Sequence, residues 1–253
     1  MVKKPVFYSE NTKISPFWRG HLFLFDTPRS VNYSPQQGNR LLWVFILMEF
    51  FIRPLILFVS RRVGISHHHW WLACNIAILV FLSYFLVRIL AGIKVSRLGL
   101  YPWGNWSKIE KLYFAQIIPI TIFIFSIINF TSLRALSGRP DLFEIVFLTL
   151  IPQVIWGAYQ EFLYRGILQT ELVRRWGAFR GILASNLVFT FGSLHAYHFL
   201  IAEKNPAHLW IFVAIFGIGL FFSVLFRRSG NLWLIGILHG LGDMFIDGLS
   251  GLS

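Results

Sequence analysis

Long apolar runs alternate with short polar and basic stretches along most of this chain. Seven runs are long enough to cross a bilayer as helices, because a helix rises about 1.5 Å per residue and the hydrocarbon core is about 30 Å thick. They lie at roughly 41–59, 70–93, 112–130, 142–172, 181–201, 209–226 and 232–249. The pattern predicts an all-α polytopic membrane bundle of about seven transmembrane helices. The fourth run exceeds one span, so we expect it to tilt or to emerge on one side.

Composition supports this class. Hydrophobic residues make up 56% of the 253 residues, charged residues make up 13%, and the mean hydropathy is +0.62, which is too apolar for an ordinary soluble domain. The first apolar run begins only at Leu41, so no cleavable signal peptide is recognisable. We expect residues 1–40 to form an irregular cytoplasmic arm and residues 41–253 to form one transmembrane domain. The single cysteine, Cys74, excludes a disulfide within the chain.

The net charge of +12 is distributed unevenly between the two ends of the predicted spans. If the spans alternate in direction, the face of the N-terminus carries Lys3, Lys4, Lys13, Arg19, Arg29, Arg40, Lys94, Arg97, Lys108, Lys111, Arg174, Arg175, Arg180, Arg227 and Arg228. The opposite face carries Arg61, Arg62, Arg134, Arg139 and Lys204. This bias predicts a cytoplasmic N-terminus in an inner or plasma membrane. The basic loops then contact membrane lipids, and no base-reading motif points to nucleic acid as a partner.

Ionisable residues inside the apolar runs concentrate in the fourth, fifth and seventh runs. A charge near the bilayer centre costs about 2.5 to 3.5 kcal/mol on insertion scales and therefore needs a partner. Counted from the cytoplasmic basic residues at about 1.5 Å per residue, Glu161, His195, His239 and Asp243 lie in one layer roughly 16 to 23 Å deep. They can satisfy one another only in the bundle interior, so the sequence predicts a shared polar cavity.

Two pairs in this layer have the spacing of neighbours on one helix face. Glu161 and Arg165 are four residues apart, and the cation there keeps the carboxylate ionised. His239 and Asp243 have the same spacing, which lets the carboxylate orient the imidazole. A buried carboxylate, two histidines and an orienting acid suit activation of water and polarisation of a peptide carbonyl. No serine, cysteine or lysine has a comparable setting, so a covalent nucleophile is not indicated.

Other polar residues of the apolar runs have simpler interpretations. Glu49 and Arg53 share the four-residue spacing, but no third partner is identifiable, and we interpret them as a structural pair. His198 has at most a supporting role. The three histidines at 67–69 stand at a span boundary and are interpreted as an interfacial anchor rather than as a metal site.

Three short motifs on the predicted helices resemble those of a known family. QEFLYR (160–165), FGSLH (191–195) and HGLGD (239–243) are similar to the E-E-x-x-x-R, F-x-x-x-H and H-x-x-x-N/D motifs of the CPBP intramembrane proteases, the CAAX-processing and bacteriocin-processing (Abi) group. The resemblance covers about 140–249 and implies that this region is the catalytic core. It implies a glutamate-dependent endopeptidase, without metal or other cofactor, that cuts a protein or peptide in a membrane cavity.

The resemblance also implies roles for single residues. Glu161 matches the second motif glutamate, Arg165 the motif arginine, His195 the histidine of the second motif, and His239 with Asp243 the third motif. In such enzymes a glutamate activates the water, while the histidines and the Asn or Asp position it and stabilise the oxyanion. We predict that Glu161 is the general base.

Position 160 departs from the family pattern. It carries Gln160 where the family usually has the glutamate assigned as general base, and an amide cannot accept a proton at neutral pH. Three explanations are open: Glu161 takes over the role, the chain is an inactivated mutant, or it is a natural non-catalytic homologue.

Other classes of function are also open. The same polar layer would serve a proton or solute transporter, although we find no repeat symmetry or pair of broken helices. A catalytically inactive protease cavity would serve a membrane scaffold that holds a membrane segment of another protein. A zinc enzyme with His195, His239 and Glu161 or Asp243 as ligands is a mechanistic variant.

Overall fold

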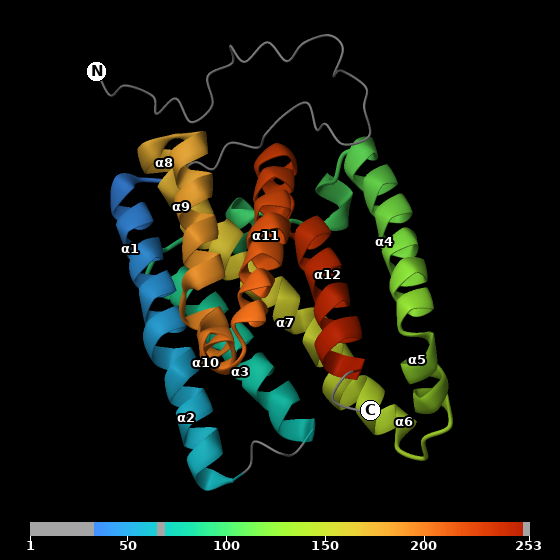
Figure 1. The fold of residues 1–253 in the computed structure, drawn as a ribbon. Helices are drawn as coiled ribbons and strands as arrows, with labels where there is room; N and C mark the ends of the chain where they lie inside the picture. Colours follow the sequence, from blue (N-terminus) through green and yellow to red (C-terminus); the bar gives the residue numbers. More distant parts are fainter. Residues whose placement is uncertain (1–32, 65–68, 250–253) are drawn as a thin grey trace, which may run out of the picture.

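The computed structural model describes residues 33–64 and 69–249, which form helices and loops without strands (Figure 1). Most of the predicted arm and the histidines at 67 and 68 lie outside the described residues. So do five of the basic residues assigned to the face of the N-terminus, namely Lys3, Lys4, Lys13, Arg19 and Arg29. The all-helical membrane bundle that the apolar pattern predicted is confirmed for the described part of the chain.

The first helical run consists of α1 (Pro35–Ile46), the wider turns of η2 (Leu47–Ile52) and α2 (Arg53–Val63). It begins at a capping box in which Ser34 and Gln37 satisfy each other's backbone N–H groups. It ends at Gly64, whose φ of +74° suits glycine. The residues from 35 to 40 are therefore helical, which corrects the expectation of an irregular arm as far as residue 40.

The next part of the chain leads from a helix that packs against α7 to the edge of the bundle. It comprises α3 (His69–Ile89), the short turns η3 (Val95–Leu98) and η4 (Trp103–Asn105), α4 (Lys108–Ile128) and α5 (Phe130–Ser137). A second capping box, formed by Ser107 and Glu110, starts α4. Figure 1 shows α4 at the edge of the bundle, and side chains such as Phe123 and Ile128 are about two-thirds exposed there (66% and 69%). We interpret this apolar face as the one that meets lipid.

The fourth apolar run is a single helical element of 35 residues, Leu142–Trp176. It is built from α6 (Leu142–Ile145), η5 (Val146–Leu150), α7 (Ile151–Glu161), η6 (Phe162–Gln169) and α8 (Thr170–Trp176). It is tilted across the middle of the bundle in Figure 1, as its length predicted. The wide π-type turns of η6 begin directly after Glu161, and such turns are frequent at functional sites.

The fifth predicted span is wrong as a continuous helix. α9 (Ala178–Phe191) ends at Gly192, which has an extended backbone with φ −79° and ψ −172°. The turn η7 (Ser193–His195) and α10 (Ala196–Lys204) follow. Because the run is apolar throughout, its hydropathy does not reveal the break.

The last part of the chain comprises η8 (Pro206–Leu209), α11 (Trp210–Ser229), α12 (Leu232–Asp243) and η9 (Met244–Gly248). The Asn231 side chain starts α12 by accepting a hydrogen bond from the backbone N–H of Trp233 at 3.0 Å. Through Nδ2 it also donates to Glu110 on α4 at 3.1 Å. These bonds fix the beginning of the helix that carries the third motif.

Five helices of the described chain are long and apolar enough to cross a membrane, rather than the seven expected. They are Pro35–Val63, Trp70–Ile89, Lys108–Ile128, Leu142–Trp176 and Pro206–Ser229. The helices α9 and α12 are not among them, but both pack in the bundle: α9 contacts α8 and α11, and α12 lies between α11 and α4 (Figure 1).

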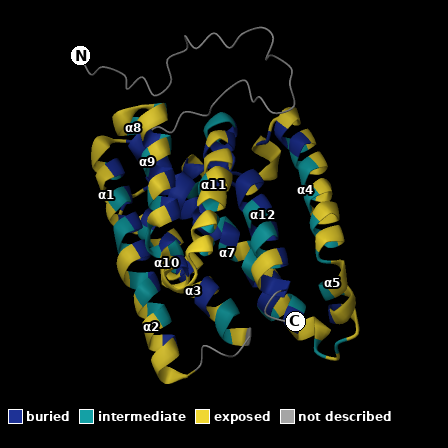
Figure 2. Cartoon of the chain, viewed as in Figure 1, coloured by how far each residue is buried: buried dark blue, intermediate teal, exposed yellow. Residues whose placement is uncertain are grey.

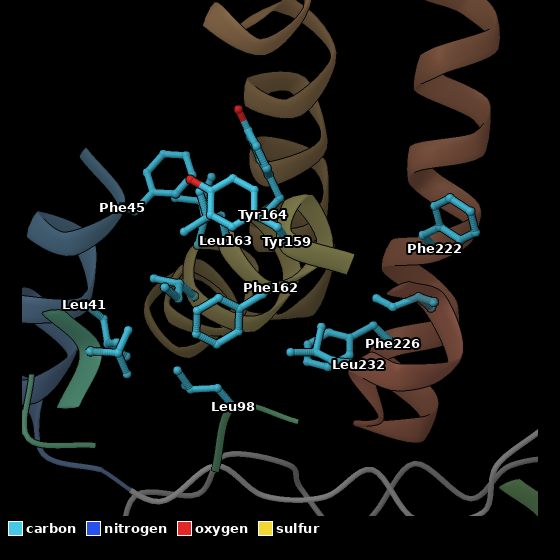
Figure 3. Packing of buried hydrophobic residues seen from close by; sticks show 14 of the residues in the cluster. Leu41, Phe45, Leu98, Tyr159, Phe162, Leu163, Tyr164, Phe222, Phe226 and Leu232 are labelled. Carbon is cyan, nitrogen blue, oxygen red and sulfur yellow. The ribbon is translucent and has the colours of Figure 1, made fainter. Parts of the chain in front are cut away.

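The core surrounds α7 and η6. Figure 2 shows buried residues concentrated on the inner helix faces and exposed residues on the outer ones. In Figure 3, side chains of α7 and η6 occupy the centre, with α1 on one side and α11 on the other. The labelled members of this cluster are Leu41, Phe45, Leu98, Tyr159, Phe162, Leu163, Tyr164, Phe222, Phe226 and Leu232. The motif helix is thus held on several sides by apolar packing, which stabilises the polar residues that it carries.

Candidate active site

The helices α7 and α12 cross in backbone contact, and this crossing positions the site. A Cβ atom added to Gly157 would overlap the backbone of Gly240, and one added to Gly240 would overlap the backbone of Val154. Only glycine permits so close an approach at these two positions. The crossing brings the first motif, which follows Gly157 by one turn, beside the third motif, which contains Gly240.

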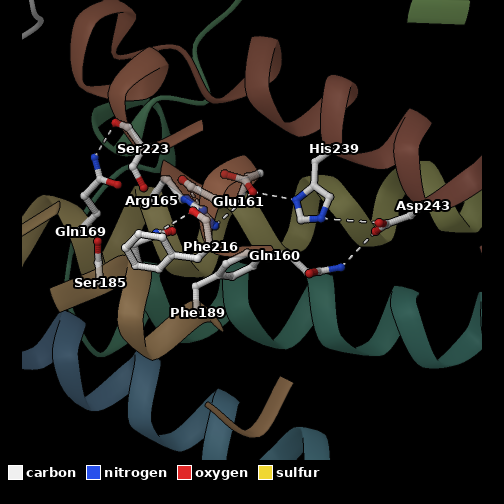
Figure 4. Close-up of polar contacts among 12 residues, drawn as sticks. Gln160, Glu161, Arg165, Gln169, Ser185, Phe189, Phe216, Ser223, His239 and Asp243 are labelled. Carbon is white, nitrogen blue, oxygen red and sulfur yellow. Dashed lines mark hydrogen bonds and ion pairs between the residues drawn. The ribbon is translucent and has the colours of Figure 1, made fainter. Parts of the chain in front are cut away.

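Glu161 lies at the centre of the site and is completely buried. Its Oε1 atom is 3.1 Å from Nη1 of Arg165, so the pair predicted from the four-residue spacing is confirmed as a contact. The same oxygen lies 2.7 Å from Nδ1 of His239 on α12 (Figure 4). One carboxylate oxygen therefore holds a guanidinium from its own helix and an imidazole from the facing helix.

Arg165 is itself fixed by two further helices. Its Nη2 atom donates to the carbonyl oxygen of Gly219 on α11 at 2.9 Å. Its guanidinium carbon lies 4.1 Å from the centre of the Phe189 ring on α9, a distance typical of a cation–π contact. A buried guanidinium held in this way provides a permanent positive charge beside Glu161.

The second nitrogen of His239 faces Asp243. Nε2 of His239 lies 3.5 Å from Oδ1 of Asp243, and the other oxygen, Oδ2, accepts a hydrogen bond from Nε2 of Gln160 at 3.1 Å. The polar contacts thus run from Arg165 through Glu161, His239 and Asp243 to Gln160 (Figure 4). We call these five residues the polar chain. Among these side chains Glu161 is 0% exposed, His239 12% and Asp243 15%, whereas Gln160 beyond Asp243 is buried.

Two aromatic rings restrain the imidazole of His239. Phe222 of α11 stacks on it, with ring centres 5.4 Å apart and an angle of 25° between the planes. Phe189 meets it edge-on at 5.9 Å. These contacts limit rotation of the ring and exclude water from one of its faces.

His195 lies beside the polar chain without joining it. Its Nδ1 atom is 2.7 Å from the carbonyl oxygen of Phe189, and its ring packs edge-on against the Phe189 ring at 4.9 Å. Phe189 therefore contacts both His195 and His239. The structure brings the second motif to the site, and the water-positioning role of His195 stays a prediction.

A second polar cluster corrects the interpretation of Glu49 and Arg53 as a pair without a third partner. Their side chains are 2.5 Å apart, as the spacing predicted. Ser193, inside the second motif, donates from Oγ to Oε1 of Glu49 at 2.6 Å and accepts from Nη2 of Arg53 at 2.9 Å. The Gly192–Ser193 step, two residues before His195, was the available signal, because a break in the helix there lets the serine hydroxyl reach another helix.

Metal ligation gains no support from the described residues, among which no group of three or more His, Cys, Asp or Glu side chains has a metal-binding arrangement. His198 contacts His208 on η8, with Nδ1 and Nε2 2.9 Å apart. The His198 ring stacks on His195 at 5.9 Å, so this pair adjoins His195, and neither histidine is a member of the polar chain.

The resemblance seen in the three motifs is matched by an independent comparison. Residues 140–245 match the family model described as type II CAAX prenyl endopeptidase Rce1-like. This segment is Rce1-like. The matched range contains all three motifs, and with them the whole polar chain and His195. Comparison of the chain with curated proteins and with solved structures gives no significant match. Over this range the chain is similar to the type II CAAX prenyl endopeptidases, and it contains helices long and apolar enough to cross a membrane.

Proposed function

We propose that this protein is an intramembrane endopeptidase that hydrolyses a peptide bond of a protein substrate in or next to the membrane, using an activated water. The observation that carries the proposal is the polar chain, in which α7 and α12 of the Rce1-like segment place two carboxylates and an imidazole in direct succession. Such a succession can hold a water, remove its proton and stabilise the negative charge on a carbonyl oxygen.

The geometry favours a positioning role for Glu161. Its carboxylate is completely buried, and Oε1 is shared between Arg165 and His239. A protonated His239 donates Nδ1–H to Glu161, which fixes the orientation of the imidazole and leaves Nε2–H as a second donor. Nε2 is then directed toward Asp243. We assign to Nε2–H of His239 the stabilisation of the oxyanion.

The substrate class follows from the family match. A segment similar to CAAX prenyl endopeptidases is best tested on a peptide with a prenylated cysteine near its C-terminus. We propose such a peptide, or a membrane protein segment of similar amphiphilic character, as the substrate. No step of the proposed reaction requires a metal or another cofactor.

The proposed orientation places the polar chain below the cytoplasmic surface. Basic residues of the described chain gather at the ends of the helices that lie toward α8 in Figure 1, including Lys108, Lys111, Arg174, Arg175, Arg227 and Arg228. By the positive-inside tendency, this end faces the cytoplasm. The protein is then a multi-pass membrane protein with its N-terminal side in the cytoplasm.

The direct test is cleavage by the full chain reconstituted in lipid vesicles. The probe is a fluorescence-quenched farnesylated CAAX peptide, compared with the same peptide without the farnesyl group. We expect cleavage that His239→Ala reduces by a factor of about 10² to 10⁴. His208→Ala is the matched control, because His208 lies outside the polar chain. Equal cleavage by the His239→Ala and unmodified chains would overturn the assignment of the site.

Gln160 is the one observation that favours a second candidate, a non-catalytic scaffold. A homologue without a base at position 160 would still hold a peptide in the cavity. This candidate predicts that the unmodified chain binds the farnesylated peptide in vesicles and releases it intact, with no cleavage by either the unmodified chain or Gln160→Glu.

A further inference from the structure

We infer that Asp243 is the general base of this site and that Gln160 is its amide partner, so that the carboxylate expected at position 160 is supplied by the opposite helix. The inference rests on the proposed endopeptidase function and deepens it. It removes the conflict between the Rce1-like match and the glutamine in the first motif.

Access to water separates the two carboxylates of the polar chain. A general base must lie within hydrogen-bonding reach of the water that it deprotonates. Glu161 has no exposed surface, and its Oε2 atom is buried without a hydrogen-bond partner in the described part of the chain. The side chain of Asp243 is 15% exposed. Asp243 is therefore the carboxylate that a water and a peptide can reach.

Gln160 orients this carboxylate. Its Nε2–H group donates to Oδ2 of Asp243 at 3.1 Å, which leaves Oδ1 on the side of His239 Nε2. The third motif of the family accepts Asn or Asp at position 243, and the first usually has glutamate at position 160. The pair in this chain thus contains one acid and one amide, with the acid on α12 and the amide on α7. An acid–amide pair of this kind keeps its hydrogen bond in either arrangement.

The charges of the polar chain support the same assignment. Glu161 and Asp243 carry two negative charges, and Arg165 carries one positive charge. A protonated His239 brings the sum to zero, which favours this state in a membrane interior where uncompensated charge is costly. Protonated His239 donates through Nδ1 to Glu161 and presents Nε2–H beside Oδ1 of Asp243. Asp243 then accepts a proton while His239 donates a hydrogen bond.

The chemical step follows from this arrangement. Asp243 takes one proton from the water as the water oxygen forms a bond to the carbonyl carbon, and the carbonyl π electrons move to its oxygen, which Nε2–H of His239 stabilises. Collapse of the tetrahedral intermediate restores the carbonyl and breaks the C–N bond, while Asp243 delivers its proton to the leaving nitrogen. The products are a carboxylic acid and an amine, and Asp243 is again a carboxylate.

The test moves the carboxylate across the site. Cleavage of the farnesylated CAAX peptide is measured for the unmodified full chain, Asp243→Asn, Gln160→Glu and the double variant Gln160→Glu/Asp243→Asn, in vesicles of the same composition. Asp247→Asn is the matched control, because it removes a carboxylate one turn further along the same helical run. Thermal unfolding of each variant in detergent shows that the fold is retained.

We expect Asp243→Asn to lower kcat by a factor of about 10³ with little change in KM. We expect the double variant to recover at least a tenth of the original kcat and Asp247→Asn to stay within a factor of two. Cleavage by Asp243→Asn within tenfold of the unmodified chain overturns the inference and leaves the endopeptidase function standing. The inference is also overturned if the unmodified chain does not cleave the peptide and the Gln160→Glu variant does. If neither of these two chains cleaves, the proposed function itself fails.

Discussion

Nδ1 of His239 on α12 lies 2.7 Å from Oε1 of Glu161 on α7, and Arg165 approaches the same oxygen at 3.1 Å. A histidine and an arginine from different helices therefore depend on one completely buried carboxylate. The contact links the stability of the bundle to the geometry of the proposed active site, because a change of Glu161 removes the carboxylate that Arg165 and His239 share.

Removal of the charge on Arg165 is expected to destabilise the fold strongly. Arg165→Met leaves Glu161 buried without its guanidinium partner, and breaking a buried pair in this way costs about 3 to 5 kcal/mol in soluble proteins. The measurement is the free energy of unfolding in mixed detergent. In the double variant Glu161→Gln/Arg165→Met the loss should be smaller than the sum of the two single losses.

The control for this prediction is Arg139→Met. Arg139 pairs with Asp141 at 2.9 Å, but both side chains are more than a third exposed, and such pairs contribute about 0 to 1 kcal/mol. If Arg165→Met proves as harmless as Arg139→Met, the buried pair does not hold the site together.

The crossing of α7 and α12 is expected to tolerate no side chain. Gly240→Ala places a Cβ atom in the backbone of Val154, and overpacking of this kind costs about 1 to 3 kcal/mol. It should also separate the two halves of the polar chain and lower kcat at least tenfold. Gly242→Ala, two residues along the same helix, meets no atom within 4 Å and should leave unfolding and cleavage unchanged. Equal behaviour of the two variants would contradict the backbone contact.

The hydroxyl of Ser193 is expected to anchor the second motif to the first helical run. Ser193→Ala removes hydrogen bonds to both members of the buried Glu49–Arg53 pair, and a hydrogen bond to a charged group contributes about 1.5 to 3 kcal/mol. We expect a loss of that size in the free energy of unfolding and a lower kcat, because His195 follows the anchor by two residues. Ser185→Ala is the control, since within the described residues that hydroxyl donates to the carbonyl of Ile182 in its own helix and to no other helix.

Chelators are expected to leave cleavage unchanged. The polar chain consists of mutual contacts between side chains, and the described residues contain no three-ligand group for a metal. Cleavage of the farnesylated peptide is compared after dialysis against 1,10-phenanthroline and after dialysis against its non-chelating 1,7 isomer. Loss of activity with the first isomer alone, restored by Zn²⁺, would establish the zinc variant of the mechanism.

The orientation of the bundle is expected to follow its basic residues. In a Cys74→Ser background, Gly104→Cys places a single thiol in η4, before α4, and Gly138→Cys places one directly after α5, at positions where an added Cβ meets nothing nearer than 3.8 Å. A membrane-impermeant maleimide added to intact cells or spheroplasts should label Gly138→Cys and spare Gly104→Cys. The reverse result would invert the proposed topology.

The sequence predicted well what depends on local spacing and on depth. The contacts of Glu161 with Arg165 and of Glu49 with Arg53 follow from the helical period, because residues four apart share a helix face. The arrival of Glu161, His239 and Asp243 at one site follows from counting the helical rise from basic ends. The length of the fourth helical element follows from its apolar run.

The contacts between helices were not predictable from the sequence. Hydropathy does not say which oxygen of Glu161 faces Nδ1 of His239, or that Gln160 faces Asp243. These contacts depend on the register of α7 against α12, which is set by Gly157 and Gly240. Ser193 was missed for a related reason, because its partners lie 140 and 144 residues away in the chain and are reached only through the break at Gly192.

The glycine crossing has a further consequence for how a peptide reaches the site. Main chain lies against main chain where Gly157 meets Gly240, so no rotamer change can loosen the two helices there. The pair of helices α7 and α12, which carries the polar chain, is therefore rigid at this crossing. The part left to move is the aromatic cover over His239, formed by Phe189 of α9 and Phe222 of α11. We therefore expect a substrate to be admitted by rotation of these two side chains, with the backbones of α7 and α12 fixed.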